Sequence, residues 1–147
     1  MKMKKKTNSL ANKLAKISHD YIRERDSSSP NITGGLCCTC QKYVEGGNFQ
    51  AGHYEPDSTG GALLRYHPHN MHGQGGYCCN INKHGQQRMA NAYTMFMIKK
   101  YGLKYVEKLR ALKYKSIKAD EIFYNKMIEL YKAKDEKKIV KYIESLI

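Results

Sequence analysis

The sequence predicts an α+β protein in which a small zinc-stapled core is flanked by an N-terminal helix and several C-terminal helices. Five cysteines fall in two tight groups, at residues 37–40 and 78–79. Most of the glycines lie between residues 34 and 85, which favours loops and short strands. Apolar residues recur at helical spacing on both sides of this stretch. We therefore expect three segments: 1–30, a basic tail and helix; 31–102, the core; and 103–147, a helical extension.

The N-terminal helix is predicted from one apolar stripe. Leu10, Leu14, Ile17 and Tyr21 are spaced by four, three and four residues, so they share one face of a helix. We expect this helix from about Ser9 to Asp26, because the following serines and Pro30 end it.

Two short strands are predicted within the glycine-rich core. The segments 49–54 and 62–66 have the composition of strands, and residues 57–61 have the composition of the loop that joins them.

Helices are expected again after Gln86. Gly102 stands where a glycine ends a helix, and a second helix is expected from Leu103 to about Leu112. The last part of the chain has further helical apolar spacing, interrupted by a charged stretch at 132–138 that we interpret as a turn.

Charge indicates the class of partner. Lys and Arg number 26 against 13 acidic residues, which gives a net charge of +13 and a pI near 9.5. Such an excess favours a polyanion, and nucleic acid above all. No run of about 18 apolar residues suits a membrane span, so we expect a cytoplasmic protein that does not enter a membrane.

The cysteines indicate a metal site. An odd count in two tight groups fits zinc better than disulfide bonds, and Cys37-x-x-Cys40 has the spacing of a zinc knuckle. Cys79 is expected to be a third zinc ligand, and the zinc is expected to be structural. The fourth ligand stays open among Cys78, Cys38 and His72.

A candidate catalytic group lies between the two cysteine pairs. Hydrolysis of a phosphodiester needs a base for water and a charge that stabilises the phosphate. His53 is the predicted general base, held by Asn70 or by a backbone carbonyl, and Asn80 offers an amide oxygen of the kind that Mg²⁺ accepts. The hypothesis requires His53 and Asn80 within about a nanometre of each other, around one metal-and-phosphate site.

These motifs, in this order, resemble the NinG (Rap) recombination nucleases of lambdoid phages. The resemblance runs from about Tyr21 to Leu109, and the motifs that carry it are Tyr21-Ile22-Arg23-Glu24-Arg25-Asp26, Cys37-x-x-Cys40, Ala51-Gly52-His53-Tyr54, Leu64-Arg65-Tyr66, Asn70-x-His72-x-Gln74, Cys79-Asn80 and Lys83-x-Gly85. It implies an HNH-like, ββα-metal core related to endonuclease VII. It also implies a metal-dependent endonuclease that cuts branched recombination intermediates such as Holliday junctions and D-loops, in a phage or prophage setting within a bacterial host.

The resemblance assigns roles to individual residues. His53 matches the general base, Asn70 the central asparagine and Asn80 the ligand of Mg²⁺ or Mn²⁺. His72 and Arg65 are further candidates for the catalytic centre. Apart from the resemblance, the chemistry of basic side chains predicts contacts to DNA at Arg23, Arg25, Arg65 and Lys83.

The sequence departs from this pattern at two positions. Gly76 stands where the family has a zinc-binding cysteine, which is why the fourth zinc ligand is open. Gly52 stands where HNH proteins often have a metal ligand, so a second ligand of the catalytic ion must be water or another side chain, with His72, Glu55, Asp57 and His84 as candidates.

Two other functions remain open. One is a non-catalytic, zinc-stapled module that binds DNA or regulates, and the other is an HNH nuclease that cuts ordinary duplex DNA. Symmetric cutting of a four-way junction needs two nicks, so a homodimer is expected, formed through the helices after Lys115.

Overall fold

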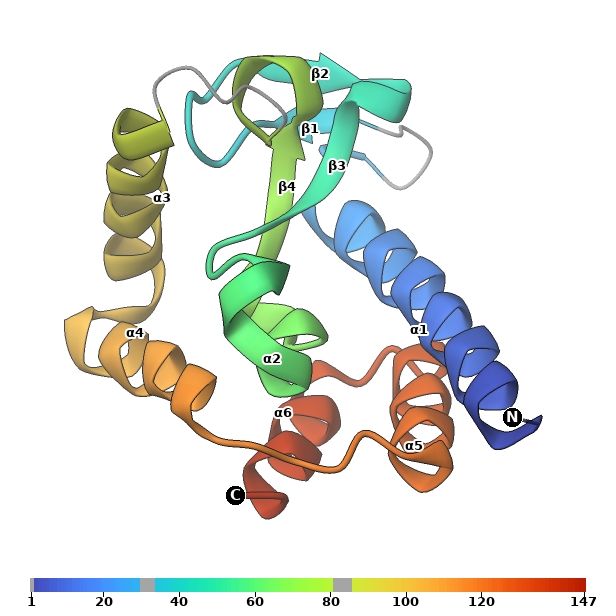
Figure 1. Cartoon of the computed structure of the whole chain (residues 1–147). Coiled ribbons are helices and arrows are strands. Elements are labelled where there is room, and N and C mark those ends of the chain that lie inside the picture. The colour runs from blue at the N-terminus through green and yellow to red at the C-terminus, as the bar shows by residue number, and fades with distance from the viewer. Residues whose placement is uncertain (1, 30–33, 81–85) are drawn as a thin grey trace.

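The computed structural model describes residues 2–29, 34–80 and 86–147, without the side chains of residues 57–59 and 86. Two small antiparallel sheets lie among helices from both ends of the chain (Figure 1). The mixture of helices and short strands predicted from the sequence is thus confirmed.

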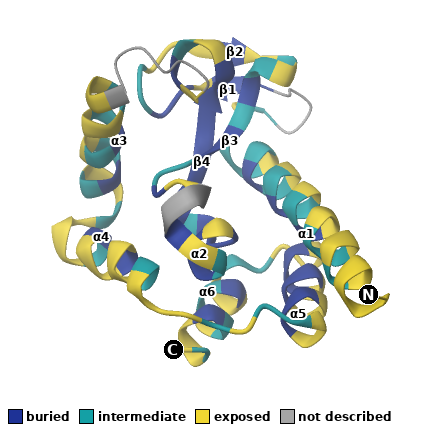
Figure 2. Cartoon of the chain, in the orientation of Figure 1, coloured by how far each residue is buried: buried dark blue, intermediate teal, exposed yellow. Residues whose placement is uncertain are grey.

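The N-terminal helix is longer than its apolar stripe predicts. Helix α1 spans Lys2–Asp26, so it ends where expected and begins seven residues earlier. Its buried side chains are Leu14, Ser18 and Ile22, and its first turns are exposed. Figure 2 shows this gradient, from a yellow N-terminal part to a darker end that reaches the strands.

Two hairpins form the sheets. Strands β1 (Gly34–Leu36) and β2 (Tyr43–Glu45) pair around the turn that carries Cys37 and Cys40. Strands β3 (Phe49–His53) and β4 (Met71–Gly75) pair with Phe49 opposite Gly75 and His53 opposite Met71. One end of the second hairpin therefore lies beside the cysteines, and the other end carries His53.

The strand predicted at 62–66 is wrong, and so is the loop predicted at 57–61. These residues belong to helix α2 (Asp57–Arg65), which is kinked at Gly61, whose φ is +68°, and has Tyr66 as its C-cap. Leu63 and Leu64 are both fully buried, at 1% and 0% exposure, which a half-buried strand with alternating faces does not allow. The true partner of β3 is β4, which follows the short 3₁₀ turn Pro68–Asn70.

The helical predictions after residue 86 are confirmed. Helix α3 (Gln86–Tyr101) ends at Gly102, whose φ is +85°. Helix α4 (Leu103–Arg110) continues into a 3₁₀ turn at Ala111–Tyr114. Helices α5 (Glu121–Lys132) and α6 (Glu136–Ser145) follow, and the charged stretch between them contains the predicted turn.

One apolar core joins the two ends of the chain. Its buried side chains come from α1, α2, α5 and α6: Leu14, Leu63, Tyr66, Phe123, Tyr124, Met127, Ile128, Leu130, Tyr131, Ile139 and Ile143. A second cluster packs α3 and α4 against Leu64 and Cys38. Both frame the β3–β4 hairpin, so its position depends on packing from distant segments.

None of the helices in the described ranges is long and apolar enough to cross a membrane.

Candidate metal centre and imidazole site

Four cysteines meet at one end of the β3–β4 hairpin. The Sγ atoms of Cys37, Cys40, Cys78 and Cys79 all lie within 4.8 Å of one another. The Cys40–Cys78 and Cys37–Cys78 sulphur distances are 3.5 and 3.7 Å, far above the ~2.05 Å of a disulfide bond. Four sulphurs around zinc at about 2.3 Å would be about 3.8 Å apart. The donor set therefore fits a tetrahedral zinc ion.

Cys78 reaches this cluster because residue 75 is a glycine. Cys78 and Cys79 lie in a π-helical turn, Gly76–Asn80. A Cβ atom at position 75 would lie 2.3 Å from Cys78 Sγ. Gly75 thus leaves the space into which the Cys78 thiol folds back, and adjacent cysteines can face one centre.

The surrounding chain prepares one thiol for metal binding. Burial alone would raise the pKa of Cys37, but the backbone N–H groups of Cys40 and Gly75 and the Thr39 hydroxyl lower it to about 6. Burial, outweighing the Thr39 hydrogen bond, raises the pKa of Cys79 to about 11. A cation would offset the repulsion among these sulphurs, and thiolates are the form that binds zinc.

The other two candidates for the fourth ligand lie elsewhere. Cys38 is buried with Leu64 and Tyr93, and burial raises the pKa of its thiol. His72 is 1% exposed, and its ring nitrogens contact the hydroxyls of Tyr93 and Tyr101 at 3.3 and 2.8 Å. Burial lowers the pKa of His72 to about 2. His72 is therefore a neutral histidine in the interior, outside the zinc cluster.

His53 lies at the opposite end of the hairpin, in a defined tautomer. Its Nε2 is 2.8 Å from the carbonyl oxygen of Arg65 at the end of α2. A carbonyl only accepts, so Nε2 carries the hydrogen and Nδ1 carries the lone pair of the neutral ring. Of the two anchors expected for His53, the structure contains the backbone carbonyl. The Arg65 side chain is exposed.

Asn70 holds the segment that provides this carbonyl. It is fully buried, and its Oδ1 accepts a 2.9 Å hydrogen bond from the Glu55 N–H. Its Nδ2 donates to the carbonyls of Glu55 and Leu64 at 3.0 and 2.9 Å. Asn70 thus ties the end of β3 to the end of α2, and it acts on His53 through the backbone.

The structure does not bring Asn80 and His53 together. Asn80 Nδ2 donates to Gln50 Oε1 at 2.8 Å, and Gln50 precedes His53 by three residues on β3. Three residues of strand span about 10 Å, and side chains three apart point to opposite faces. The contact of Asn80 therefore lies about 10 Å along the strand from His53 and on the opposite face, which does not support one shared metal-and-phosphate centre.

The remaining predicted ligands of a catalytic ion are engaged or lie outside the described residues. Glu55 Oε1 accepts a 2.7 Å hydrogen bond from Arg110 Nε. His84 and the Asp57 side chain are not among the described residues.

Two of the predicted DNA contacts are turned inward. Arg23 Nε donates to the carbonyl of Phe49 at 2.8 Å. Arg25 donates to the carbonyls of Pro68 and Met71 at 2.9 and 2.7 Å, and its side chain is 18% exposed. The geometry therefore favours a structural role for both, which fixes α1 to the β3–β4 hairpin. Lys83 lies outside the described residues.

Sequence reasoning missed two neighbours of these sites. Thr39 Oγ1 lies 3.2 Å from Cys37 Sγ and accepts from Gln74 Nε2 at 3.3 Å. The ring of His19, on α1, packs edge-to-face with that of His53, with centroids 5.7 Å apart. The position of Thr39 inside the Cys-x-x-Cys loop was a usable signal. A single histidine on a helix gives none.

Comparison with known proteins identifies the family. The model of the Bacteriophage Lambda NinG protein family matches residues 1–141. No curated protein and no solved structure matches the chain significantly. The match covers nearly the whole chain, including α1, both hairpins and the cysteine cluster, and the chain therefore belongs to the NinG family.

Proposed function

We propose that this chain is an endonuclease that hydrolyses phosphodiester bonds in branched recombination intermediates, such as Holliday junctions and D-loops. The observation that carries the proposal is the tethered imidazole of His53 in a chain of this family. With Nε2 donating to the Arg65 carbonyl, Nδ1 is the atom that takes a proton from the attacking water. The charge of +13 supports a polyanionic substrate.

The zinc centre has a structural role in this proposal. Two of the cysteines lie in the turn between β1 and β2, and the other two follow β4, so a bound zinc would fix the end of the hairpin on which His53 is presented. Structural zinc contributes ~10 kcal/mol or more of apparent binding free energy to small domains. The exposed side chain of Arg65 is proposed to contact a phosphate through its planar guanidinium.

A catalytic Mg²⁺ or Mn²⁺ ion is part of the proposal through the family resemblance. Asn80 offers one hard oxygen, Oδ1, because its Nδ2 is bound to Gln50. Magnesium sites usually add one or two carboxylates. Within the described parts of the chain, the cysteines are the one group of three or more metal-binding side chains. These residues do not assemble a magnesium centre beside His53, so no step is assigned to the ion.

The test is cleavage of a synthetic four-way junction in Mg²⁺, in Mn²⁺ and in a chelator, by wild type and by His53→Ala. We expect cleavage by wild type with a divalent ion and a loss of 100-fold or more in His53→Ala, with zinc content and junction affinity retained. Tyr114→Ala, at an exposed position, is the matched control. Equal cleavage by wild type and His53→Ala would overturn the proposal.

One alternative is favoured by a specific observation. The separation of His53 from Asn80 suits a non-catalytic, zinc-stapled module that binds DNA. Tight junction binding by wild type without cleavage in any of these buffers would establish that alternative. A linear duplex of the same sequence, cut as fast as the junction, would instead identify a nuclease for ordinary duplex DNA.

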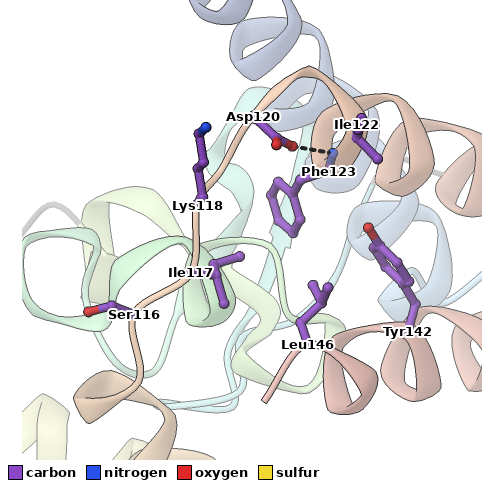
Figure 3. Close-up of a pocket in the computed structure, with 8 residues that line it drawn as sticks. All are labelled: Ser116, Ile117, Lys118, Asp120, Ile122, Phe123, Tyr142 and Leu146. Carbon is purple, nitrogen blue, oxygen red and sulfur yellow. Dashed lines mark hydrogen bonds between the residues drawn. The ribbon is translucent and has the colours of Figure 1, made fainter.

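A homodimer is proposed for symmetric cutting. The segments after Lys115 line a groove of about 340 Å³ whose walls include Ile117, Phe123 and Leu146 (Figure 3). Ile122 also lines this groove and is 76% exposed. We expect light scattering to show two protein chains per particle, at least in the complex with junction DNA. A monomer both free and bound would contradict the dimer.

A further inference from the structure

We propose that His19 is a second catalytic residue, which donates a proton to the leaving oxygen of the phosphodiester. This inference rests on the proposed function and extends it. It begins from the edge-to-face contact between the rings of His19 and His53, with centroids 5.7 Å apart. His19 lies on α1 and His53 on β3, and the two residues are 34 positions apart in the sequence.

The position of His19 distinguishes it from the histidines of the interior. His67 and His72 are 2% and 1% exposed, and burial lowers the pKa of each, to about 3 and about 2. His19 and His53 are both half-buried, so each side chain is partly exposed to solvent. The buried face of α1 is formed by Leu14, Ser18 and Ile22, and His19 lies beside that face.

A polar stripe on α1 leads to His19. Lys5, Asn12 and Lys16 precede it by fourteen, seven and three residues, which places them on the same side of a helix. All three are exposed. The two lysines of this stripe provide positive charge for a nucleic acid backbone, and Lys16 also pairs with Asp20 at 2.8 Å. A strand that follows this stripe would reach the His19–His53 pair.

The pair supplies both proton transfers of hydrolysis. Water attacks phosphorus, and one proton passes from this water to Nδ1 of His53. The bond from phosphorus to the leaving oxygen breaks, and that oxygen takes one proton from the imidazolium of His19. The products are a phosphate monoester and an alcohol, and exchange with solvent restores both rings. Imidazole suits both roles because it gains and loses protons near neutral pH.

The need for such a donor follows from the arrangement of the site. The Asn80 amide is bound to Gln50, three residues before His53 on β3. The other predicted metal ligands with described side chains have their own partners, Arg110 for Glu55 and two tyrosine hydroxyls for His72. A proton donor at the leaving oxygen therefore fills a role that the described metal-binding residues do not fill there.

The experiment replaces the leaving oxygen by sulphur. A thiolate leaves without being protonated, so a junction with a bridging sulphur at the scissile phosphate needs no proton donor. The sulphur is placed on the 3′ side in one substrate and on the 5′ side in another, so that the leaving atom is covered. Single-turnover cleavage is measured for wild type, His19→Asn, His53→Ala and the control Lys13→Gln, an exposed lysine of α1 outside the stripe.

We expect His19→Asn to cleave the all-oxygen junction about 100-fold more slowly than wild type, which is the usual scale of general acid catalysis. On one of the sulphur substrates the deficit is expected to fall below tenfold. His53→Ala is expected to stay defective on both, and Lys13→Gln to match wild type throughout.

Two results would overturn the role of His19. One is unchanged cleavage by His19→Asn, and the other is an equal deficit on oxygen and on both sulphur substrates, which would indicate a purely structural contact. A wild-type protein that cleaves none of the three substrates would refute the proposed function itself, and with it this extension.

Discussion

The cysteine cluster and the imidazole pair lie at opposite ends of one hairpin and depend on the chain in different ways. The cluster is built from residues that are close in sequence within each of two short turns. The imidazole pair needs α1, β3 and the end of α2 to come together. The cysteine cluster is therefore specified by local sequence, whereas the imidazole pair is formed by tertiary packing.

This difference predicts that a substitution at one end of the hairpin leaves the other end intact. The largest effect on stability is expected at the cysteines. Cys37→Ser should abolish stoichiometric zinc binding and lower the melting temperature by more than 10 °C, since the metal contributes ~10 kcal/mol or more. Zinc content and thermal unfolding measure this. Cys38→Ala is the matched control, because Cys38 packs outside the cluster; loss of zinc in Cys38→Ala would contradict the assigned ligand set.

The next effect is expected at the imidazole end. Asn70→Ala removes three buried hydrogen bonds and leaves the Glu55 N–H without its partner, so it should cost about 3 kcal/mol in the free energy of unfolding. Urea titration measures this cost. Zinc stoichiometry is expected to stay at the wild-type value, and a loss of zinc in Asn70→Ala would show that the ends are not separable.

Acid should weaken the interior near the imidazole end in two stages. Burial lowers the pKa of His67 to about 3 and of His72 to about 2, from an ordinary value of about 6.5. The unfolded chain therefore takes up protons that the folded chain excludes. Stability is full above pH 6.5 and falls as the pH drops below it, by up to about 1.4 kcal/mol per pH unit for each histidine.

Glu136 adds the second stage. Burial would raise its pKa, but hydrogen bonds from His69 and Tyr21 and the charge of Arg25 lower it to about 2. Its contribution is present above about pH 4.5 and is lost as the pH falls towards 2. His72→Gln should reduce the slope between pH 6.5 and 4.5 by about half, measured by urea unfolding across pH. An unchanged slope would mean that His72 is not excluded from protonation.

The smallest effect concerns DNA binding. Lys5→Gln should lower the slope of log affinity against log salt by about one unit, as expected for one phosphate contact. Lys13→Gln, off the stripe, should leave it unchanged, and fluorescence anisotropy with junction DNA measures both. Equal effects of the two variants would show that the DNA strand does not follow the polar stripe on α1.

The extent of sequence prediction follows the same division. The end of α1 at Asp26, the end of α3 before Gly102 and the cysteine cluster all depend on local patterns, and the structure confirms them. Strand β4 was missed because three of the residues in Met71–Gly75 are glycine or glutamine, which hide a strand pattern. The segment that contains Leu63 and Leu64 was wrongly predicted as a strand, because short apolar runs occur in both helices and strands.

The imidazole end shows what local patterns omit. His19 has no distinguishing neighbours in the sequence, and only the packing of α1 on the hairpin puts it beside His53. Arg23 and Arg25 looked like DNA contacts because basic residues on a helix usually face solvent. Their carbonyl partners at Phe49, Pro68 and Met71 come from distant segments.

The close approach of the Cys78 thiol to Gly75 constrains how related chains can diverge. While residue 78 provides the thiol, any side chain at 75 would collide with it. A chain that places its cysteine at 76 has no thiol over residue 75, so the nearest contact of a side chain there would be Val44, whose Cγ1 would lie 3.1 Å from the added Cβ. The two layouts can interconvert only through ancestors that keep glycine at 75, so positions 75, 76 and 78 should change as a linked set across the lineage.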